Sequence, residues 1–197
     1  MPNWCDNQIT ITGPNSVIDK IEKIVKEESN NAENGLLQFF HPMPKVMLDT
    51  EAGPIAKTKA EKNARKSRKL EFGAENWYDW RVNNWSTKWE VCEFYGVDRQ
   101  YLTEQSEGES VITFGFSSAW APPIGAYEQF IISSSEKKQD VSIKAYYYEG
   151  GCDFMGEWDN GNDDCYAPSD YKSTDDFWQD GVGSTLDDTF NITESMA

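Results

Sequence analysis

The chain has few of the residues on which many enzymes and metal sites depend. It contains one histidine, His41, in 197 residues. Zinc sites and Ser-His-Asp or Cys-His catalytic sets are commonly built around histidine, so either arrangement would rest on this one side chain. We therefore expect no catalytic residues, no metal ion and no cofactor.

Paired cysteines and long apolar runs are also missing. No signal peptide opens the chain, and no apolar run approaches the roughly 18 residues that a membrane-spanning helix needs. The four cysteines form no CxxC motif and lie far apart, at Cys5, Cys92, Cys152 and Cys165. Isolated thiols are typical of reduced cytoplasmic proteins, so we expect a cytoplasmic protein with no membrane partner.

Basic residues are scarce, with 18 lysines and arginines against 34 acidic residues and a net charge of −16. Such a surface repels nucleic acid and anionic lipid, so direct nucleic-acid binding is not expected. The exception is the run Lys57–Lys69, which has seven basic residues and one acidic residue. It shows no apolar periodicity, which predicts a solvated helix or loop.

Large aromatic residues are abundant and make up for a hydrophobic content of only 38%. Four of the eight tryptophans fall within Trp77–Trp89. Their spacing predicts a helix to about Asn84, followed by an extended segment from Thr87 to Phe94. Two interpretations stay open, a tryptophan-lined core or an aromatic pocket for a ligand.

The N-terminal segments predict a strand, a helix and a second strand. Polar and β-branched residues alternate over residues 7–13, which indicates a strand. A helix capped by Asn15 or Ser16 follows, with an apolar stripe that includes Ile21. Residues 36–40, with the sequence LLQFF, are predicted to be the next strand.

A second strand-helix-strand unit follows the tryptophan-rich stretch. Its elements are a strand over residues 110–116, a helix beginning at Pro123, a strand over residues 141–148 and a hairpin partner over residues 153–158. Two such units predict an α+β fold of the ferredoxin-like type, a two-layer sandwich with a mainly antiparallel sheet and two helices on one face.

The remainder of the chain is strongly acidic. From Glu149 onward there are thirteen acidic residues and one basic residue, Lys172. We expect a ferredoxin-like domain over residues 1–160, with a basic insert at about 45–72. An acidic C-terminal extension over residues 161–197 should be partly docked, because it also contains aromatic residues.

Four short motifs resemble, in the same order, those of the YubB-type ferredoxin-like family of phages and plasmids. The motifs are Met1–Asn7, Asn84–Trp89, Ala119–Pro123 and Gly156–Trp158. The resemblance implies a fold and a mobile-element origin but no reaction. Ser86 stands where the family pattern would have glycine.

The first functional hypothesis is a non-enzymatic phage or mobile-element protein that binds and inhibits a host protein. This anti-defence or host-takeover role would use an acidic surface as a mimic of nucleic acid, so the partner should have a basic surface. The carboxylates assigned to this surface are Asp159, Asp163, Asp164, Asp170, Asp175, Asp176 and Asp180.

Two other hypotheses remain open. A small molecule or nucleotide could bind in a pocket formed by the tryptophan motifs. Its predicted residues are Asn84, Trp85, Lys88, Trp89, Trp120, Glu157 and Trp158. An enzyme using a metal bound to Asp159, Asp163 and Asp164 is the third, although the spacing is not that of an EF-hand loop.

Overall fold

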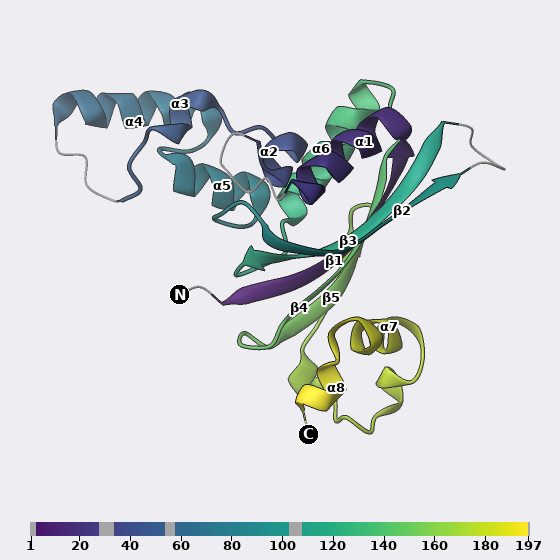
Figure 1. The fold of residues 1–197 in the computed structure, drawn as a ribbon. Helices are drawn as coiled ribbons and strands as arrows, with labels where there is room; N and C mark the ends of the chain where they lie inside the picture. The colour runs from purple at the N-terminus through teal and green to yellow at the C-terminus, as the bar shows by residue number, and fades with distance from the viewer. Residues whose placement is uncertain (1–2, 28–33, 54–57, 103–107, 197) are drawn as a thin grey trace.

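Figure 1 shows the computed structural model, which describes residues 3–27, 34–53, 58–102 and 108–196. Met1 and Pro2 of the first motif and Lys57 of the basic run lie outside the described residues.

A six-stranded sheet forms the centre of the molecule, with strand order β2-β3-β1-β4-β5-β6. Every neighbouring pair of strands is antiparallel. The strands are β1 (Trp4–Pro14), β2 (Cys92–Leu102), β3 (Glu109–Ala119), β4 (Ser142–Glu149), β5 (Phe154–Asp159) and β6 (Asn162–Tyr166). The expectation of an α+β fold with an antiparallel sheet is confirmed.

Helices occupy both sides of this sheet (Figure 1). They are α1 (Asn15–Lys26), α2 (Leu36–Phe40), α3 (Lys45–Leu48), α4 (Lys59–Phe72), α5 (Trp77–Trp85), α6 (Ile124–Glu136), α7 (Gly181–Phe190) and α8 (Ile192–Ser195), with short 3₁₀ turns η1 (Pro168–Asp170) and η2 (Asp176–Trp178). Helices α1, α2 and α6 cover one face, and α7 packs on β4 and β5 from the other.

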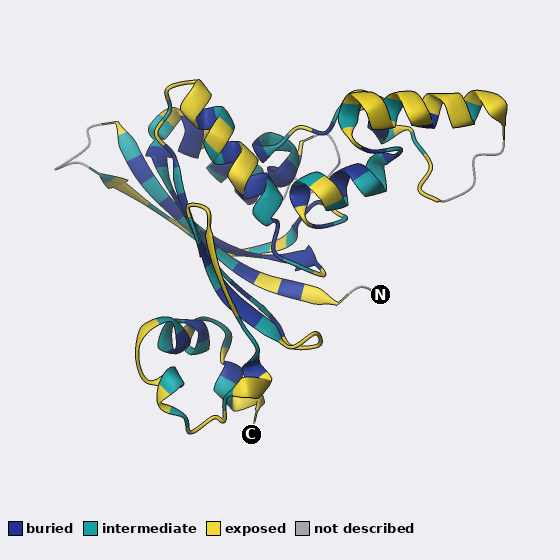
Figure 2. Ribbon diagram, turned by 180° about the vertical axis from the view of Figure 1, so that it is seen from behind, coloured by how far each residue is buried: buried dark blue, intermediate teal, exposed yellow. Residues whose placement is uncertain are grey.

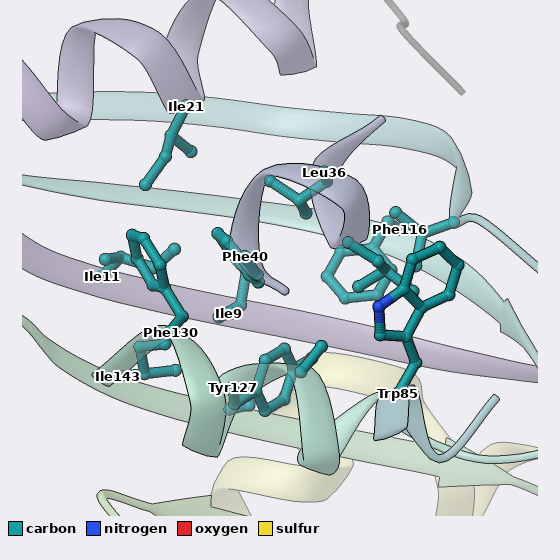
Figure 3. Close-up of a cluster of buried hydrophobic side chains, with 14 of the residues drawn as sticks. Ile9, Ile11, Ile21, Leu36, Phe40, Trp85, Phe116, Tyr127, Phe130 and Ile143 are labelled. Atoms are coloured by element: carbon teal, nitrogen blue, oxygen red, sulfur yellow. The ribbon is translucent and has the colours of Figure 1, made fainter. Parts of the chain in front are cut away.

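The main core lies between the sheet and the layer of α1, α2 and α6. Strand β1 is central, so its inward residues Ile9 and Ile11 are fully buried. Ile21 points at them from α1, and Phe130 of α6 stacks on Phe40 with ring centroids 4.4 Å apart (Figure 3). Two-residue alternation on the strand and helical spacing on α1 therefore bring the apolar residues to one interface.

The predicted strand over residues 36–40 is wrong, because this segment is helix α2. Leu36, Leu37 and Phe40 are all buried, at a spacing that fits one helical face. The N-terminus of α2 is stabilised by Glu90, whose carboxylate accepts the N–H of Leu37 at 2.7 Å and that of Gln38 at 3.1 Å. This cap lies more than fifty residues further along the chain, so local sequence does not reveal it.

Two further boundaries differ from the predictions. Helix α1 follows Pro14 and has no side-chain cap, whereas Asn15 or Ser16 was expected to supply one. The extended segment predicted from Thr87 begins later, because β2 starts at Cys92. Between α5 and β2 the chain turns at Ser86, the C-cap, which has a left-handed φ of 67°.

The acidic end of the chain folds into a small lobe, residues 160–196, which we call the acidic lobe. It begins with β6, which pairs with β5 and extends the sheet. Behind β4 and β5 it forms a second apolar cluster. The fully buried or nearly buried members of this cluster are Met155, Trp178, Leu186 and Ile192. The lobe is therefore anchored by apolar side chains, although its surface is acidic.

Helix α4 extends away from the sheet, as Figures 1 and 2 show. Arg65 is its only buried residue. In the described parts of the chain, no helix combines the length and apolar character needed to cross a membrane.

Candidate functional site

Three exposed tryptophans gather at one end of the sheet. Trp4 opens β1, Trp89 precedes β2 and Trp120 follows β3, and their exposed fractions are 40%, 37% and 39%. The rings of Trp4 and Trp89 lie 6.1 Å apart. The N–H of Trp120 donates to the carbonyl of Asn3 at 3.0 Å, which joins the third segment to the first. Three segments distant in sequence therefore form one aromatic surface.

Lys88 lies between two of these indoles. Its Nζ is 3.9 Å from the ring centroid of Trp89 and 4.0 Å from that of Trp120. A cation over two indole faces is attracted by both ring quadrupoles, which orders the rings. We call Trp4, Lys88, Trp89 and Trp120 the tryptophan patch.

Two residues at this patch have unusual, left-handed backbone conformations. Ser86 ends α5 with φ 67°, and Trp120 leaves β3 with φ 76°. Non-glycine residues rarely adopt such values, and glycine would fit the Ser86 position without strain. The Ser86 hydroxyl compensates in part by accepting the N–H of Gly125 at 3.1 Å.

The remaining residues of the predicted pocket lie elsewhere. Trp85 is buried in the main core, where its Nε1 donates to the carbonyl of His41 at 2.8 Å (Figure 3). Trp158 is buried against Tyr127, with ring centroids 5.4 Å apart. The amide of Asn84 donates to a carbonyl of its own helix α5.

Glu157 lies on the opposite face of the sheet from Trp158. It is the β5 neighbour of Trp158, and adjacent strand residues point to opposite faces. It pairs with Lys144 of β4 at 3.1 Å, on the face that carries the acidic lobe. Of the seven predicted pocket residues, the structure therefore brings Lys88, Trp89 and Trp120 together and places the other four elsewhere.

Two carboxylates that sequence reasoning did not single out border the patch. Asp6 lies two residues along β1 from Trp4. The Ser117 hydroxyl is 3.4 Å from a carboxylate oxygen of Asp6 and 3.1 Å from one of Glu93. Burial, and then the charge of Glu93, raise the pKa of Asp6. The sequence signal for Asp6 was its position in the first motif, Met1–Asn7.

Two buried charged residues, Arg81 and Glu90, flank Lys88 and Trp89 in the sequence. The guanidinium of Arg81 lies 5.2 Å from the ring centroid of Trp77 and 4.8 Å from that of Trp85. Burial raises the pKa of Glu90 to about 7, although three backbone N–H groups and Arg81 favour the ionised carboxylate. Both side chains are more than nine-tenths buried, so their role is structural.

The acidic lobe uses some of its predicted carboxylates for its own folding. Asp163 accepts the Tyr147 hydroxyl at 2.7 Å, and burial, followed by this bond, raises the pKa of Tyr147. Asp175 accepts the Lys172 N–H at 2.9 Å. Asp180 caps α7 by accepting the Gly181 N–H, and Asp159 accepts the side-chain amide of Asn160.

The other predicted carboxylates of the lobe are free. Asp164, Asp170 and Asp176 are exposed, and none has a hydrogen bond or ion pair to another described side chain. Residues 160–197 have nine acidic residues and only Lys172 as a base. The lobe therefore presents unneutralised negative charge on a folded support.

Neither surface is a closed ligand cavity or a metal site. A hollow of about 680 Å³ between α1 and α2 is lined in part by Lys20, Lys23 and Phe39, but by none of the predicted site residues. Within the described ranges, no three His, Cys, Asp or Glu side chains are grouped so as to hold a metal ion.

Comparison with known proteins identifies no family for this chain. No family model matches the chain, and no curated protein matches it. Among solved structures, it is similar to the crystal structure of protein api92 from Yersinia pseudotuberculosis, of family DUF1281. The TM-score is 0.43 at 11% sequence identity, over 85% of this chain and 98% of that one. This similarity is too low to assign a fold or a function.

Proposed function

We propose that this is a non-enzymatic protein that binds a basic partner protein through its acidic lobe. The observation that carries the proposal is the set of free carboxylates at Asp164, Asp170 and Asp176 on a lobe anchored by its own apolar cluster. A fixed array of charges loses less entropy on binding than a disordered acidic tail would.

The physical mechanism is charge complementarity. An acidic surface attracts a basic groove over about one Debye length and raises the association rate. A protein groove that normally holds phosphates offers such a basic surface, so the lobe would act as a mimic of nucleic acid. Inhibition of the partner would follow from occupying this groove.

The proposal also includes the fold family of the protein and its origin. The connection β1-α1-β2-β3-α6-β4, with α1 and α6 on one face, supports a ferredoxin-like core to which β5 and β6 are added. Such a core fits the YubB-type resemblance and an origin in a phage or plasmid. The partner would then be a host protein of the cytoplasm, and the role anti-defence or host takeover.

The test is a comparison of two variants with the same net charge. One carries D164N, D170N and D176N on the lobe. The control carries E128Q, E136Q and D140N, which are exposed on or just after α6, across the sheet. The partner is captured from host cells with the wild-type chain, purified, and its association rate is measured for each variant.

The lobe variant should associate about tenfold more slowly at low salt, and the control should resemble the wild type. Between 50 and 500 mM salt the Debye length falls from about 14 Å to about 4 Å, so the difference should shrink. Equal rates for the two variants would show that net charge, and not the lobe, matters.

The tryptophan patch supports a second candidate, binding of a planar, anionic small molecule such as a nucleotide. The supporting observation is an ordered cation between two half-exposed indoles. An aromatic ring could stack on Trp4 or Trp120 while Lys88 pairs with a phosphate. Titration of common nucleotides should quench tryptophan fluorescence in the wild type, and K88A should weaken the response. No change with any nucleotide would leave the patch as a protein contact.

A further inference from the structure

Helix α4 contacts the body through arginines and, at its C-terminal end, through the partly buried Phe72. Arg65 donates to the Gly53 carbonyl at 2.5 Å and pairs with Glu61 at 3.0 Å. Arg68 donates to the carbonyl of Glu75 at 2.7 Å. The helix begins at a Thr58 cap and ends at Gly73, where φ is 75°. It is therefore a well-defined helix with one attached side.

The side that faces water forms a regular row. Lys59, Lys62, Lys66 and Leu70 are separated by three, four and four residues, so they share one face of the helix. All four are exposed, and Leu70 is 92% exposed. No described carboxylate pairs with the three lysines. We call this row the basic arm.

The same chain carries a complementary surface that the arm cannot reach. The acidic lobe lies at the other end of the molecule, beyond the sheet (Figures 1 and 2). Beside its free carboxylates, the rings of Tyr171 and Phe177 stack at 3.9 Å and remain partly exposed. The lobe thus offers both charge for the lysines and an apolar surface for Leu70.

We propose that the basic arm of one copy docks on the acidic lobe of a second copy. The two surfaces differ, so the contact is head to tail, and the pair keeps one arm and one lobe free for further copies. Repulsion between two chains of net charge −16 opposes this, but it is screened beyond about 8 Å at physiological salt. Contact pairs at 3–4 Å are screened much less.

Nucleic acid is a less suitable occupant. The row of three lysines spans about 10 Å, since an α-helix rises 1.5 Å per residue. A longer phosphate backbone would run beyond it onto a surface that is acidic overall.

The experiment is a charge swap in the full chain. The arm variant carries K59E, K62E and K66E, and the lobe variant carries D164K, D170K and D176K. A control carries K20E, K137E and K138E, which reverse three exposed lysines away from the arm. Sedimentation velocity measures association from about 10 µM to about 500 µM.

Wild type and control should self-associate, and each swapped variant alone should lose about tenfold or more in association constant. An equimolar mixture of the two swapped variants should associate again, because each arm then meets a lobe of opposite charge. Circular dichroism verifies that each variant is folded.

A wild type that stays monomeric, or a mixture that does not associate, would overturn the proposal. So would a labelled DNA duplex that binds wild type but not the arm variant while self-association is unchanged. The measurement uses only this chain, so it can succeed even if the acidic lobe has no basic partner in the host.

Discussion

The carboxylate of Glu90 should make the stability of this protein depend on pH in an unusual direction. It is 7% exposed, and burial raises its pKa from an ordinary 4.5 to about 7. The unfolded chain therefore releases this proton near pH 4.5, whereas the folded chain keeps it until about pH 7. Most native carboxylates act in the opposite sense.

The sign and size follow from linkage. Between about pH 4.5 and pH 7 the folded state binds more protons, so the free energy of unfolding falls as pH rises. A shift of about 2.5 units corresponds to about 3 kcal/mol. This stability is fully present below about pH 4.5 and is lost once the pH exceeds about 7.

Glu90→Gln isolates this contribution, because the amide cannot titrate. The substitution also turns an amide donor toward one of the N–H groups of Leu37 and Gln38, which costs about 1–3 kcal/mol at every pH. Urea unfolding of both proteins from pH 4.5 to 8 gives the difference in free energy. Other titrating groups cancel in that difference.

The wild type should lose about 3 kcal/mol more than the variant over this range. Glu136→Gln, at an exposed site on α6, controls for the loss of one negative charge. A difference between wild type and Glu90→Gln that stays constant with pH would refute the reasoning. It would mean that the N–H donors and Arg81 lower the pKa of Glu90 by at least as much as burial raises it.

Three further substitutions test the packing. Ile21→Asp should lower the free energy of unfolding by about 4 kcal/mol, seen in a thermal melt, because it puts an unpaired charge in the main core. Gly183→Ala would place a methyl group 1.9 Å from the Phe177 carbonyl, so limited proteolysis should cut the acidic lobe first. Gly125→Ala would bring a methyl group within 2.7 Å of the Asn84 carbonyl; a change in fluorescence should report displacement of α5, and an unchanged spectrum would contradict it.

The regular elements were predictable because their patterns are local. Ile9 and Ile11 alternate with polar residues, and the apolar stripe of α1 has helical spacing, so both faces could be read directly. Helix α2 could not be predicted, because a run of five mainly apolar residues fits either a helix or a strand. Its N-terminus is capped by Glu90, a contact visible only once the chain has folded.

The tryptophan patch was predicted only in part, because local patterns reveal some of its residues and not others. Tryptophans in short motifs indicated an aromatic surface, but the left-handed turn at Ser86 separates buried Trp85 from exposed Trp89. Local periodicity cannot anticipate such a turn. The inclusion of both Glu157 and Trp158 in one pocket, by contrast, was avoidable, since neighbouring residues of a strand face opposite sides.

The acidic extension shows why composition alone overstates a charged recognition surface. A carboxylate that caps a helix or accepts a hydroxyl is part of the fold, so replacing Asp163 or Asp180 would change stability together with binding. Asp164, Asp170 and Asp176 make no such contact, and their replacement by asparagine changes charge with almost no change in shape. Of the seven predicted carboxylates, only these three therefore separate recognition from folding. A loss of partner binding on neutralising them, without a change in melting temperature, would have a single physical cause.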